Sequence, residues 1–391
     1  MRRIVAVSDF CAPAPPRASR FDPADFARAW AGPPPPPPAP RAEDVRVTGG
    51  YLERLPLAMV AAGLADAAEV WTFAGHDDEP WDSRAALHGG PRPRALPDRP
   101  GLSRRVFRAD GHPAPHGSAD LLAHVAAEGP PDVLCVWGLG VAASVLDACR
   151  ASVLVYNSID APALRVADDL ARRFDVILAG SEAQAEEIRA RAPGALVAVM
   201  PIGPEFASPE TFRPLGTPKE FDVVYVACAQ PYKRHDLLFD ALAARPGTRA
   251  LCVVGYGETA DDLRREAADR GLDVTFVGPP GVPYDEVNRL MNLARVGVVC
   301  GEADGAPAIL TEYMLAGLPV LANDRLACGL QFIRPETGVA APPALFARKL
   351  GEMLSDAARF RPREAVRARW AWPHTARRLA TLVEGARSRK T

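Results

Sequence analysis

The chain has 391 residues, of which 48% are hydrophobic and 24% charged, and its formal net charge is −2. This length is too great for one hydrophobic core, so we expect two globular domains. The near-neutral charge argues against a nucleic-acid-binding protein, which would need a strongly basic surface. No stretch of the sequence has the roughly 20 apolar residues that a membrane-spanning helix requires.

The seven cysteines are interpreted as reduced, buried, apolar side chains of a cytoplasmic protein, because no two of them form a Cys-x-x-Cys pair. The sequence therefore predicts no zinc site and no other metal site. Four of the cysteines lie in apolar runs that are typical of strands: Cys135, Cys228, Cys252 and Cys300.

The N-terminal half alternates short apolar runs with segments of helical spacing. The first apolar run, 4–7, is too short for a signal peptide and is predicted to be a strand. Residues 10–48 form a long excursion with a short helix expected at 21–30 and six consecutive prolines at 33–38, interpreted as a stiff spacer. Further strands are expected at 69–73, 105–107, 132–137, 152–156, 176–179 and 196–202, and helices at 51–68, 119–127, 142–149, 164–173 and 182–191.

A second alternating run follows a stretch rich in proline and glycine. Alternation of this kind predicts an α/β fold with two Rossmann-like, doubly wound parallel-sheet domains that face a cleft. We place the N-terminal domain at 1–205, the linker at 206–219, the C-terminal domain at 220–370 and a closing helix at 371–391. Strands of the second domain are expected at 222–227, 250–254, 274–277, 296–300 and 319–322, and helices at 236–244, 259–270, 284–293, 308–316 and 344–355.

An acidic loop precedes the helix expected at 308–316. Its two carboxylates, Asp304 and Glu312, are eight residues apart, and Pro307 suits the first helical position. We expect Asp304 to reach sugar hydroxyls and Glu312 to accept hydrogen bonds from a ribose, while free N–H groups at the helix start hold a phosphate. The alternative is a plain loop with two solvated acids. The remaining ligand contacts expected in this loop are Gly305, Ala306, Ala308, Ile309 and Leu310.

A basic turn precedes the helix expected at 236–244. Lys233 and Arg234 lie where a cation and free N–H groups could neutralise a diphosphate. The alternative is a solvated basic pair. The chain has only four lysines, so a lysine in this turn is less readily explained by chance: Lys219, Lys233, Lys349 and Lys390.

These two segments resemble the retaining GT-B glycosyltransferases of the family 4-like "glycosyl transferases group 1" class. Residues 304–320 are similar to the family's acidic-x7-Glu signature and the Gly-Leu-Pro-Val that follows it, with Asp304 in place of the first glutamate. Lys233 matches the family's diphosphate lysine. By contrast, Cys228 stands at the position of the family's diphosphate arginine, and Arg234 stands at that of the following glycine.

The resemblance implies transfer of a sugar from a nucleotide-diphosphate sugar with retained configuration, and without a metal or other cofactor. Lys233, Asp304 and Glu312 would be the catalytic residues. The acceptor would be a glycan, a lipid-linked molecule or a small molecule, with peripheral contact to the inner face of the membrane. The resemblance also implies donor contacts by Gly49 and Gly50 at the phosphates, by Gly255 in a Gly-x-Gly turn, and by the backbone of Val277 and Gly278 at the base.

Several alternatives stay open. A degenerate GT-B protein would bind a nucleotide sugar without transfer, which the loss of the arginine at Cys228 suggests, and a GT-B epimerase or phosphorylase would need no second acceptor. Gly49-Gly50 could simply begin a helix, and His76 and His235 are expected to be surface or turn histidines. Asn157, Ser158 or Asp160 could make polar contacts where the family often has a histidine near the sugar. A dinucleotide oxidoreductase is disfavoured, because no Gly-x-Gly-x-x-Gly follows the first strand.

Overall fold

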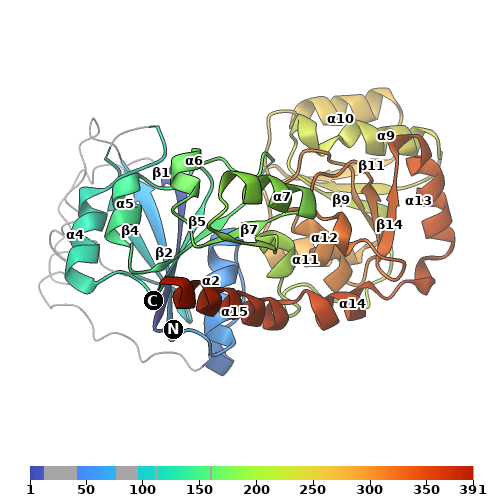
Figure 1. The fold of residues 1–391 in the computed structure, drawn as a ribbon. Helices are drawn as coiled ribbons and strands as arrows, with labels where there is room; N and C mark the ends of the chain where they lie inside the picture. Colours follow the sequence, from blue (N-terminus) through green and yellow to red (C-terminus); the bar gives the residue numbers. More distant parts are fainter. Residues whose placement is uncertain (13–41, 76–95, 111–112, 159–160, 391) are drawn as a thin grey trace, which may run out of the picture.

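The computed structural model describes residues 1–12, 42–75, 96–110, 113–158 and 161–390 (Figure 1). The proline run, the helix expected at 21–30, His76 and Asp160 lie outside these ranges.

The N-terminal half is built on a sheet of eight strands in the order β3-β4-β2-β1-β5-β6-β7-β8. All neighbouring strands are parallel except β3, which runs antiparallel to β4. The central strands are continuous apolar runs, because helices cover both faces of the sheet. The strands are β1 (Arg3–Ala12), β2 (Ala67–Ala74), β3 (Leu96–Arg99), β4 (Leu102–Arg108), β5 (Val133–Trp137), β6 (Val153–Asn157), β7 (Val176–Ala179) and β8 (Leu196–Val199).

The helices of this half depart from the predicted pattern in three places. The helix expected at 51–68 ends at Ala61, because the chain turns at Gly63 with a positive φ of 67° to enter β2. The helix expected at 164–173 is one turn, and the strand expected at 196–202 ends early and gives way to a short helix. The helices are α2 (Tyr51–Ala61), α4 (Ala119–Glu128), α5 (Ala143–Ala148), α6 (Asp168–Ala171), α7 (Glu182–Arg191) and α8 (Ile202–Glu205).

The C-terminal half is built on a fully parallel sheet of six strands in the order β11-β10-β9-β12-β13-β14. This is the doubly wound order 3-2-1-4-5-6, in which the winding direction reverses between the first and fourth strands. The last strand, β14, was not predicted from the sequence. The strands are β9 (Phe221–Val226), β10 (Ala250–Val253), β11 (Val274–Val277), β12 (Ala294–Val299), β13 (Val320–Asn323) and β14 (Gly338–Ala341).

The helices of the C-terminal half lie close to their predicted positions and cover both faces of the sheet (Figure 1). None of the helices in the described ranges is both long enough and apolar enough to cross a membrane. They are α9 (His235–Ala243), α10 (Ala260–Asp269), α11 (Tyr284–Asn292), α12 (Ile309–Leu315), α13 (Phe346–Ser355) and α14 (Pro362–Arg369).

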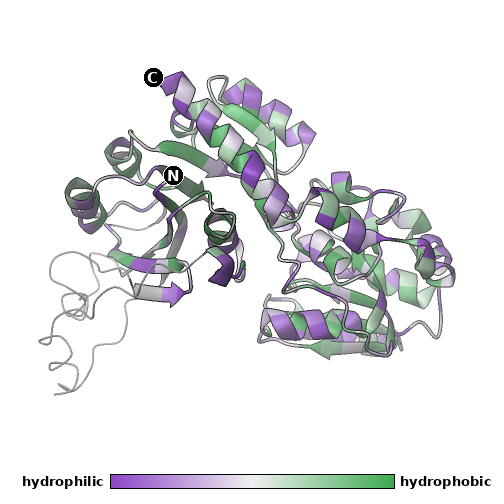
Figure 2. Cartoon of the chain, turned by 90° about the horizontal axis from the view of Figure 1, so that it is seen from below, coloured by the Kyte–Doolittle hydropathy of each residue, from purple (hydrophilic) through white to green (hydrophobic). Residues whose placement is uncertain are grey.

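The last helix, α15 (Trp372–Lys390), leaves the C-terminal half and packs against the N-terminal sheet (Figures 1 and 2). Its apolar face, which includes Leu379 and Val383, joins the hydrophobic core of that sheet. Near its end, Lys390 pairs with Asp175 at 2.7 Å, and Arg387 pairs with Asp132 at 3.2 Å. Both ends of the described chain therefore lie on the same half of the molecule.

Six of the seven cysteines are buried as predicted, whereas Cys11 at the end of β1 is only half-buried. Burial raises the pKa of the Cys149 and Cys252 thiols to about 12, so both stay protonated at neutral pH.

Candidate functional site

The two chemically distinctive loops meet where the winding of the C-terminal sheet reverses. Strands β9 and β12 are neighbours there, and the loops that follow them leave from the same edge of the sheet. The loop after β9 carries Lys233, and the loop after β12 carries Asp304. Their side chains form an ion pair and are only 16% and 12% exposed. The structure thus brings together two residues that are 71 positions apart in the sequence.

Backbone contacts fix the turn that carries Lys233. The phenol of Tyr225, on β9, donates a hydrogen bond to the Lys233 carbonyl at 2.5 Å. The N–H of Glu302, in the loop after β12, donates to the carbonyl of Tyr232 at 3.2 Å. The Lys233 ammonium also lies 5.0 Å from the centre of the Tyr232 ring. These contacts hold the two loops in one arrangement before any ligand binds.

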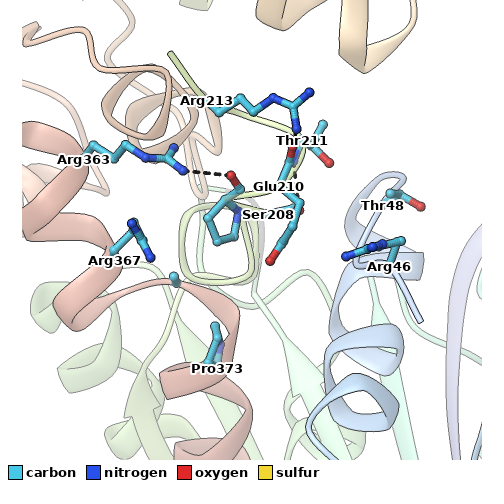
Figure 3. A pocket seen from close by; sticks show the side chains of 11 residues that line it. Arg46, Thr48, Ser208, Glu210, Thr211, Arg213, Arg363, Arg367 and Pro373 are labelled. Carbon is cyan, nitrogen blue, oxygen red and sulfur yellow. Dashed lines mark hydrogen bonds between the residues drawn. The ribbon is translucent and has the colours of Figure 1, made fainter. Parts of the chain in front are cut away.

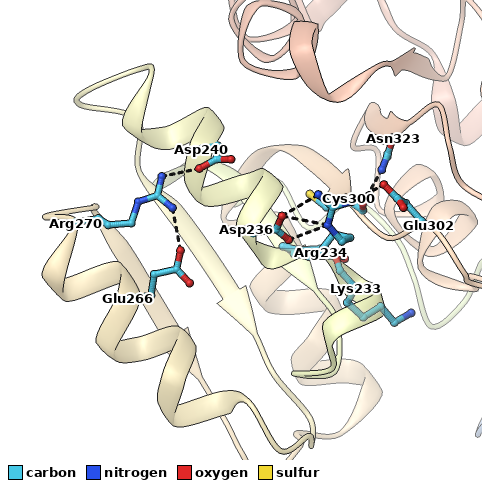
Figure 4. A network of polar contacts seen from close by, with 10 residues as sticks. Lys233, Arg234, Asp236, Asp240, Glu266, Arg270, Cys300, Glu302 and Asn323 are labelled. Atoms are coloured by element: carbon cyan, nitrogen blue, oxygen red, sulfur yellow. Dashed lines mark hydrogen bonds and ion pairs between the residues drawn. The ribbon is translucent and has the colours of Figure 1, made fainter.

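Arg234 is directed away from the Lys233–Asp304 pair. Its guanidinium binds Asp236, with contacts of 2.8–3.1 Å, and also pairs with Glu302. Figure 4 shows Arg234 and Lys233 pointing in different directions from the same turn. Arg234 has a left-handed backbone, with φ 53° and ψ 50°, which is the conformation that favours glycine. In this arrangement two carboxylates hold the guanidinium, so Arg234 would have to leave them to make the predicted contact with a diphosphate.

Glu312 lies on α12 and pairs with an arginine from the other half of the molecule. Its Oε1 is 2.6 Å from Nη1 of Arg54, on α2, and the two side chains are 7% and 4% exposed. Arg54 also donates from Nε to the carbonyl of Gly49 at 2.7 Å and lies over the rings of Phe212 and Tyr284. Burial by itself would lower the pKa of Arg54, but Glu312 and the nearby tyrosines raise it, so the guanidinium stays charged.

Two glycines of the N-terminal half let the acidic loop approach closely. A Cβ atom on Gly180 would lie 2.2 Å from the carbonyl oxygen of Gly305, and one on Gly203 would lie 2.7 Å from that of Ala306. Both distances are far below van der Waals contact, so only glycine fits. The phenol of Tyr51, on α2, donates to the Ala306 carbonyl at 3.4 Å. We call these contacts, together with the Arg54–Glu312 pair, the interdomain seam.

The start of α12 differs in detail from the prediction. The helix begins at Ile309, and the N–H of Leu310 donates to the carbonyl of Pro307 at 3.1 Å. Of the three amides predicted to be free for a phosphate, Leu310 is therefore engaged, whereas Ala308 and Ile309 stand at the partly exposed start of the helix.

Gly49 and Gly50 begin helix α2. The N–H of Gly50 donates to the Glu53 carboxylate at 2.9 Å, which caps the helix, and Gly49 has a positive φ of 90°. The helix-start alternative is thus correct for their local structure. They also lie at the seam, because the Gly49 carbonyl holds Arg54.

The predicted nucleobase contacts, Val277 and Gly278, lie at the end of β11. The carbonyl of Val277 accepts a hydrogen bond from the Val254 N–H at 2.8 Å, and the carbonyl of Gly278 accepts one from Arg264. Gly278 has a φ of 79°, and a Cβ there would lie 2.1 Å from the Val254 oxygen. The neighbouring Gly255 approaches Gly281. Each carbonyl has a second lone pair, so both can still accept a hydrogen bond from a ligand.

Three unpaired polar atoms lie at the carboxyl ends of β5 and β6 in the N-terminal half. Nε1 of Trp137, Oδ1 of Asn157 and Oγ of Ser158 are buried and have no hydrogen-bond partner within the described part of the chain. Trp137 and Asn157 are direct neighbours in the sheet. A buried polar atom without a partner is costly and calls for an explanation, and a ligand's hydroxyl groups would supply one. The sequence singled out Asn157 and Ser158, but nothing in it pointed to Trp137.

His235 was expected to be a surface or turn histidine; it directly follows the basic turn, at the start of α9, but it is buried. It is 3% exposed, and its ring packs 4.8 Å from that of Tyr225. Burial, aided by the charge of Lys233, lowers the pKa of His235 to about 4, so the ring is neutral at physiological pH.

The comparisons with known proteins agree with this architecture. The model of the family "Glycosyl transferases group 1" matches residues 208–369. The sucrose-phosphate synthase of Thermosynechococcus elongatus superposes with a TM-score of 0.66 at 19% identity, over 99% of this chain and 100% of that one. Alr3699/HepE of Anabaena, solved with UDP and glucose, superposes with a TM-score of 0.63 at 16% identity, over 98% of this chain and 100% of that one. The chain has the GT-B fold.

The part of this GT-B chain that matches the family model contains Lys233, Asp304 and Glu312. Arg54 lies outside the match, on the half of the molecule that the family model does not cover. A lipopolysaccharide outer core galactosyltransferase, WaaB, also superposes along almost the whole chain, with a TM-score of 0.57 at 14% identity, over 98% of this chain and 99% of that one. A search among curated proteins finds no match.

Proposed function

We propose that the chain is a glycosyltransferase that moves a sugar from a nucleotide-diphosphate sugar to a separate acceptor with retained configuration. The observation that carries this proposal is the meeting of Lys233 and Asp304 at the reversal point of the second sheet, with Glu312 on the helix that follows. The match to group 1 glycosyltransferases supports it. So does the fold shared with HepE, whose structure holds UDP and glucose.

Donor binding would exchange partners within two ion pairs. Without a ligand, Lys233 neutralises Asp304 and Arg54 neutralises Glu312. A nucleotide-diphosphate sugar carries negative phosphates and neutral hydroxyl groups. Lys233 would turn to the diphosphate, while Asp304 and Glu312 would accept hydrogen bonds from the sugar and the ribose. Each charged group thus keeps a partner, which limits the desolvation cost of the exchange.

Arg54 is our candidate for the second phosphate cation. The position that the resemblance assigns to an arginine holds Cys228, a buried thiol 3.5 Å from the hydroxyl of Tyr232. Arg234 is held by Asp236 and Glu302. Arg54 comes from the opposite half and reaches Glu312 across the seam. The diphosphate of the donor would therefore contact both Lys233 and Arg54 only when the two halves are closed. Closure also excludes water from the site.

The proposed chemistry uses charge stabilisation rather than a protein nucleophile. As the anomeric carbon–oxygen bond breaks, the diphosphate leaves and one of its oxygens takes the proton of the acceptor hydroxyl. The acceptor oxygen then bonds to the anomeric carbon on the same face. Lys233 would stabilise the charge that develops on the diphosphate, an effect of roughly 3 kcal/mol for one well-placed donor. The proposal includes no resident cofactor.

The acceptor would approach from the N-terminal half. The unpaired polar atoms of Trp137, Asn157 and Ser158 could bind hydroxyl groups of the acceptor or of the transferred sugar. We propose a glycan, lipid-linked or small-molecule acceptor and a cytoplasmic site of action, with peripheral contact to the inner face of the membrane.

Nucleotide binding tests the donor site. The melting temperature of the wild-type chain would be measured with UDP, GDP, ADP and dTDP, alongside Lys233→Met and the control Lys349→Met. Lys349 is the matched control because it pairs with Glu352 on the surface of α13. One nucleotide at about 100 times its Kd should stabilise the wild type and the control by about 2.7 kcal/mol, and Lys233→Met much less. Stabilisation by none of the four nucleotides would contradict the proposal.

The degenerate binding protein remains the second candidate, favoured by the thiol of Cys228 at the arginine position. It predicts the same nucleotide binding without release of nucleotide from the matching nucleotide sugar. A coupled assay for released nucleoside diphosphate, run with and without a panel of glycan acceptors, separates the two candidates. Release that depends on Lys233 favours the transferase.

A further inference from the structure

A cavity of about 780 Å³ opens beside the linker, and none of the candidate donor residues lines it. Three separate parts of the chain form its walls: the stretch before α2, the linker, and α14 with the start of α15 (Figure 3). Residues of both halves of the molecule therefore face the same space.

The lining of this cavity, which we call the arginine pocket, is strongly positive. It contains four arginines and one carboxylate, although the whole chain has a formal net charge of −2. The carboxylate, Glu210, accepts hydrogen bonds from the Ser208 hydroxyl at 2.9 Å and from the Trp372 indole at 3.4 Å. It forms no ion pair with the arginines in the described part of the chain. The arginines are Arg46, Arg213, Arg363 and Arg367.

Within the described residues, the arginine side chains of the pocket form no ion pair with a carboxylate. Arg363 is half-buried, and among the described residues its guanidinium donates only to backbone carbonyls, including Phe212 at 2.8 Å and Pro209 at 3.0 Å. Burial, together with the nearby charges of Arg367 and Arg213, lowers the pKa of Arg363, although the Glu210 carboxylate acts in the opposite direction. Neither Arg46 nor Arg367 has a side-chain ion pair or hydrogen bond to any other described residue. An anion in the pocket would relieve this repulsion.

The chemistry of the lining indicates the kind of anion. Guanidinium groups present paired N–H donors that match the oxygens of a phosphate. The hydroxyl groups of Thr48, Ser208 and Thr211 lie among them, and the cavity is much larger than a single phosphate. We propose that the arginine pocket binds a small, soluble phosphate ester that also carries hydroxyl groups.

A ligand in this pocket would contact both segments that hold Arg54. Thr48 directly precedes Gly49, whose carbonyl accepts from Arg54, and Thr211 directly precedes Phe212, whose ring lies 5.5 Å from the Arg54 guanidinium. Arg46 and Arg367 approach the cavity from opposite halves (Figure 3). A phosphate ester that bridges these two arginines would favour the docked arrangement of the halves.

Calorimetric titration of the full chain with glycerol 3-phosphate, at fixed ionic strength, tests the proposal. The variant is Arg46→Ala with Arg367→Ala, since both side chains are exposed and unpaired and their removal should not affect folding. The control is Arg377→Ala, an exposed arginine of α15 outside the pocket. We expect binding to the wild type, to the control and to Lys233→Met, and binding at least about tenfold weaker to the double variant.

Two results would overturn the proposal directly: no binding of glycerol 3-phosphate at millimolar concentration, or equal binding by the double variant. Cosedimentation with phosphatidylglycerol vesicles, but not phosphatidylcholine vesicles, that needs both arginines and occurs without binding of the soluble ester would assign the pocket to a lipid headgroup instead. Nucleotide stabilisation should persist in the double variant. Its loss would show that the pocket and the donor site are one site, which also overturns the proposal.

Discussion

Two ion pairs stand in the candidate site, and they are built in different ways. Lys233–Asp304 joins two loops of one sheet and keeps some contact with solvent, whereas Arg54–Glu312 joins the two halves and is almost completely buried. The first pair follows from the strand order of the C-terminal half alone. The second exists only while the halves are docked. The Lys233–Asp304 pair can therefore form in the C-terminal half by itself, whereas the Arg54–Glu312 pair depends on the interdomain seam.

The largest expected effect comes from removing one partner of the buried pair. Glu312→Ala leaves the Arg54 charge buried without a carboxylate, and should lower the free energy of unfolding by about 3–5 kcal/mol in urea denaturation. The double variant Arg54→Met, Glu312→Leu removes both charges and should recover most of this loss. A cost below about 1 kcal/mol for Glu312→Ala would mean that the seam is open to water in solution.

Acid should weaken the packing that supports the Lys233 turn. His235 lies behind the Lys233 turn, and its folded-state pKa is lowered to about 4 from an ordinary value of 6.5. The unfolded chain binds the proton first, so the stabilisation is present above pH 6.5 and is lost as the pH falls towards 4. The loss is at most roughly 3 kcal/mol from this residue.

Urea denaturation at several pH values measures this effect. His235→Phe keeps the ring contact with Tyr225 and cannot titrate, so its stability should fall less steeply between pH 6.5 and 4. Equal pH slopes for the wild type and the variant would contradict the assigned burial. His124, in the other half, also has a pKa lowered to about 4 by burial, so His124→Phe should flatten the slope in the same way.

A methyl group at the seam should have an intermediate effect. Gly203→Ala places a Cβ atom 2.7 Å from the Ala306 carbonyl oxygen. This oxygen is a backbone atom, so it cannot move aside as easily as the end of a flexible side chain. We expect a loss of about 1–3 kcal/mol in unfolding free energy, from overpacking. Gly194→Ala is the matched control in the same half, because no heavy atom lies within 4 Å of its Cβ position. Equal stability of the two variants would show that the halves do not approach as closely as described.

The smallest effect is expected at the basic turn. Arg234→Gly removes the left-handed strain of a non-glycine residue, about 1 kcal/mol, but also removes partly exposed ion pairs of similar worth. The net change in unfolding free energy should be below about 0.5 kcal/mol. Arg234→Ala loses the ion pairs and keeps the strain, so it should be less stable than the glycine variant by about 1 kcal/mol. A more stable alanine variant would contradict the left-handed assignment.

Much of the C-terminal half could be predicted because its strands are continuous apolar runs separated by helices of clear periodicity. Lys233 and Asp304 could be placed together for the same reason, since each follows a strand at the point where the winding reverses. The helix expected at 164–173 is reduced to the single turn α6, because Leu164 and Val166 are buried in the irregular segment that precedes it.

The sequence contained no sign of the seam. An arginine four residues after Gly50 looks like any charge on an amphipathic helix, and its partner Glu312 lies 258 positions away. The pairing depends on how two separately folded sheets dock, which no local pattern encodes. The left-handed backbone of Arg234 was also not predicted, although the family has a glycine at this position. The unpaired atom of Trp137 could not be foreseen, because burial without a partner is a property of the packed structure.

The return of α15 to the first sheet has a consequence for biosynthesis. The core that contains β1 also contains Leu379 and Val383, which leave the ribosome only after the entire second sheet. The C-terminal half is continuous in sequence and can fold as soon as α14 emerges. The half made first is thus completed last, and until then the face that α15 covers is apolar and open to chaperones or to association with other nascent chains. A chain that stops before Trp372 would keep that face exposed permanently.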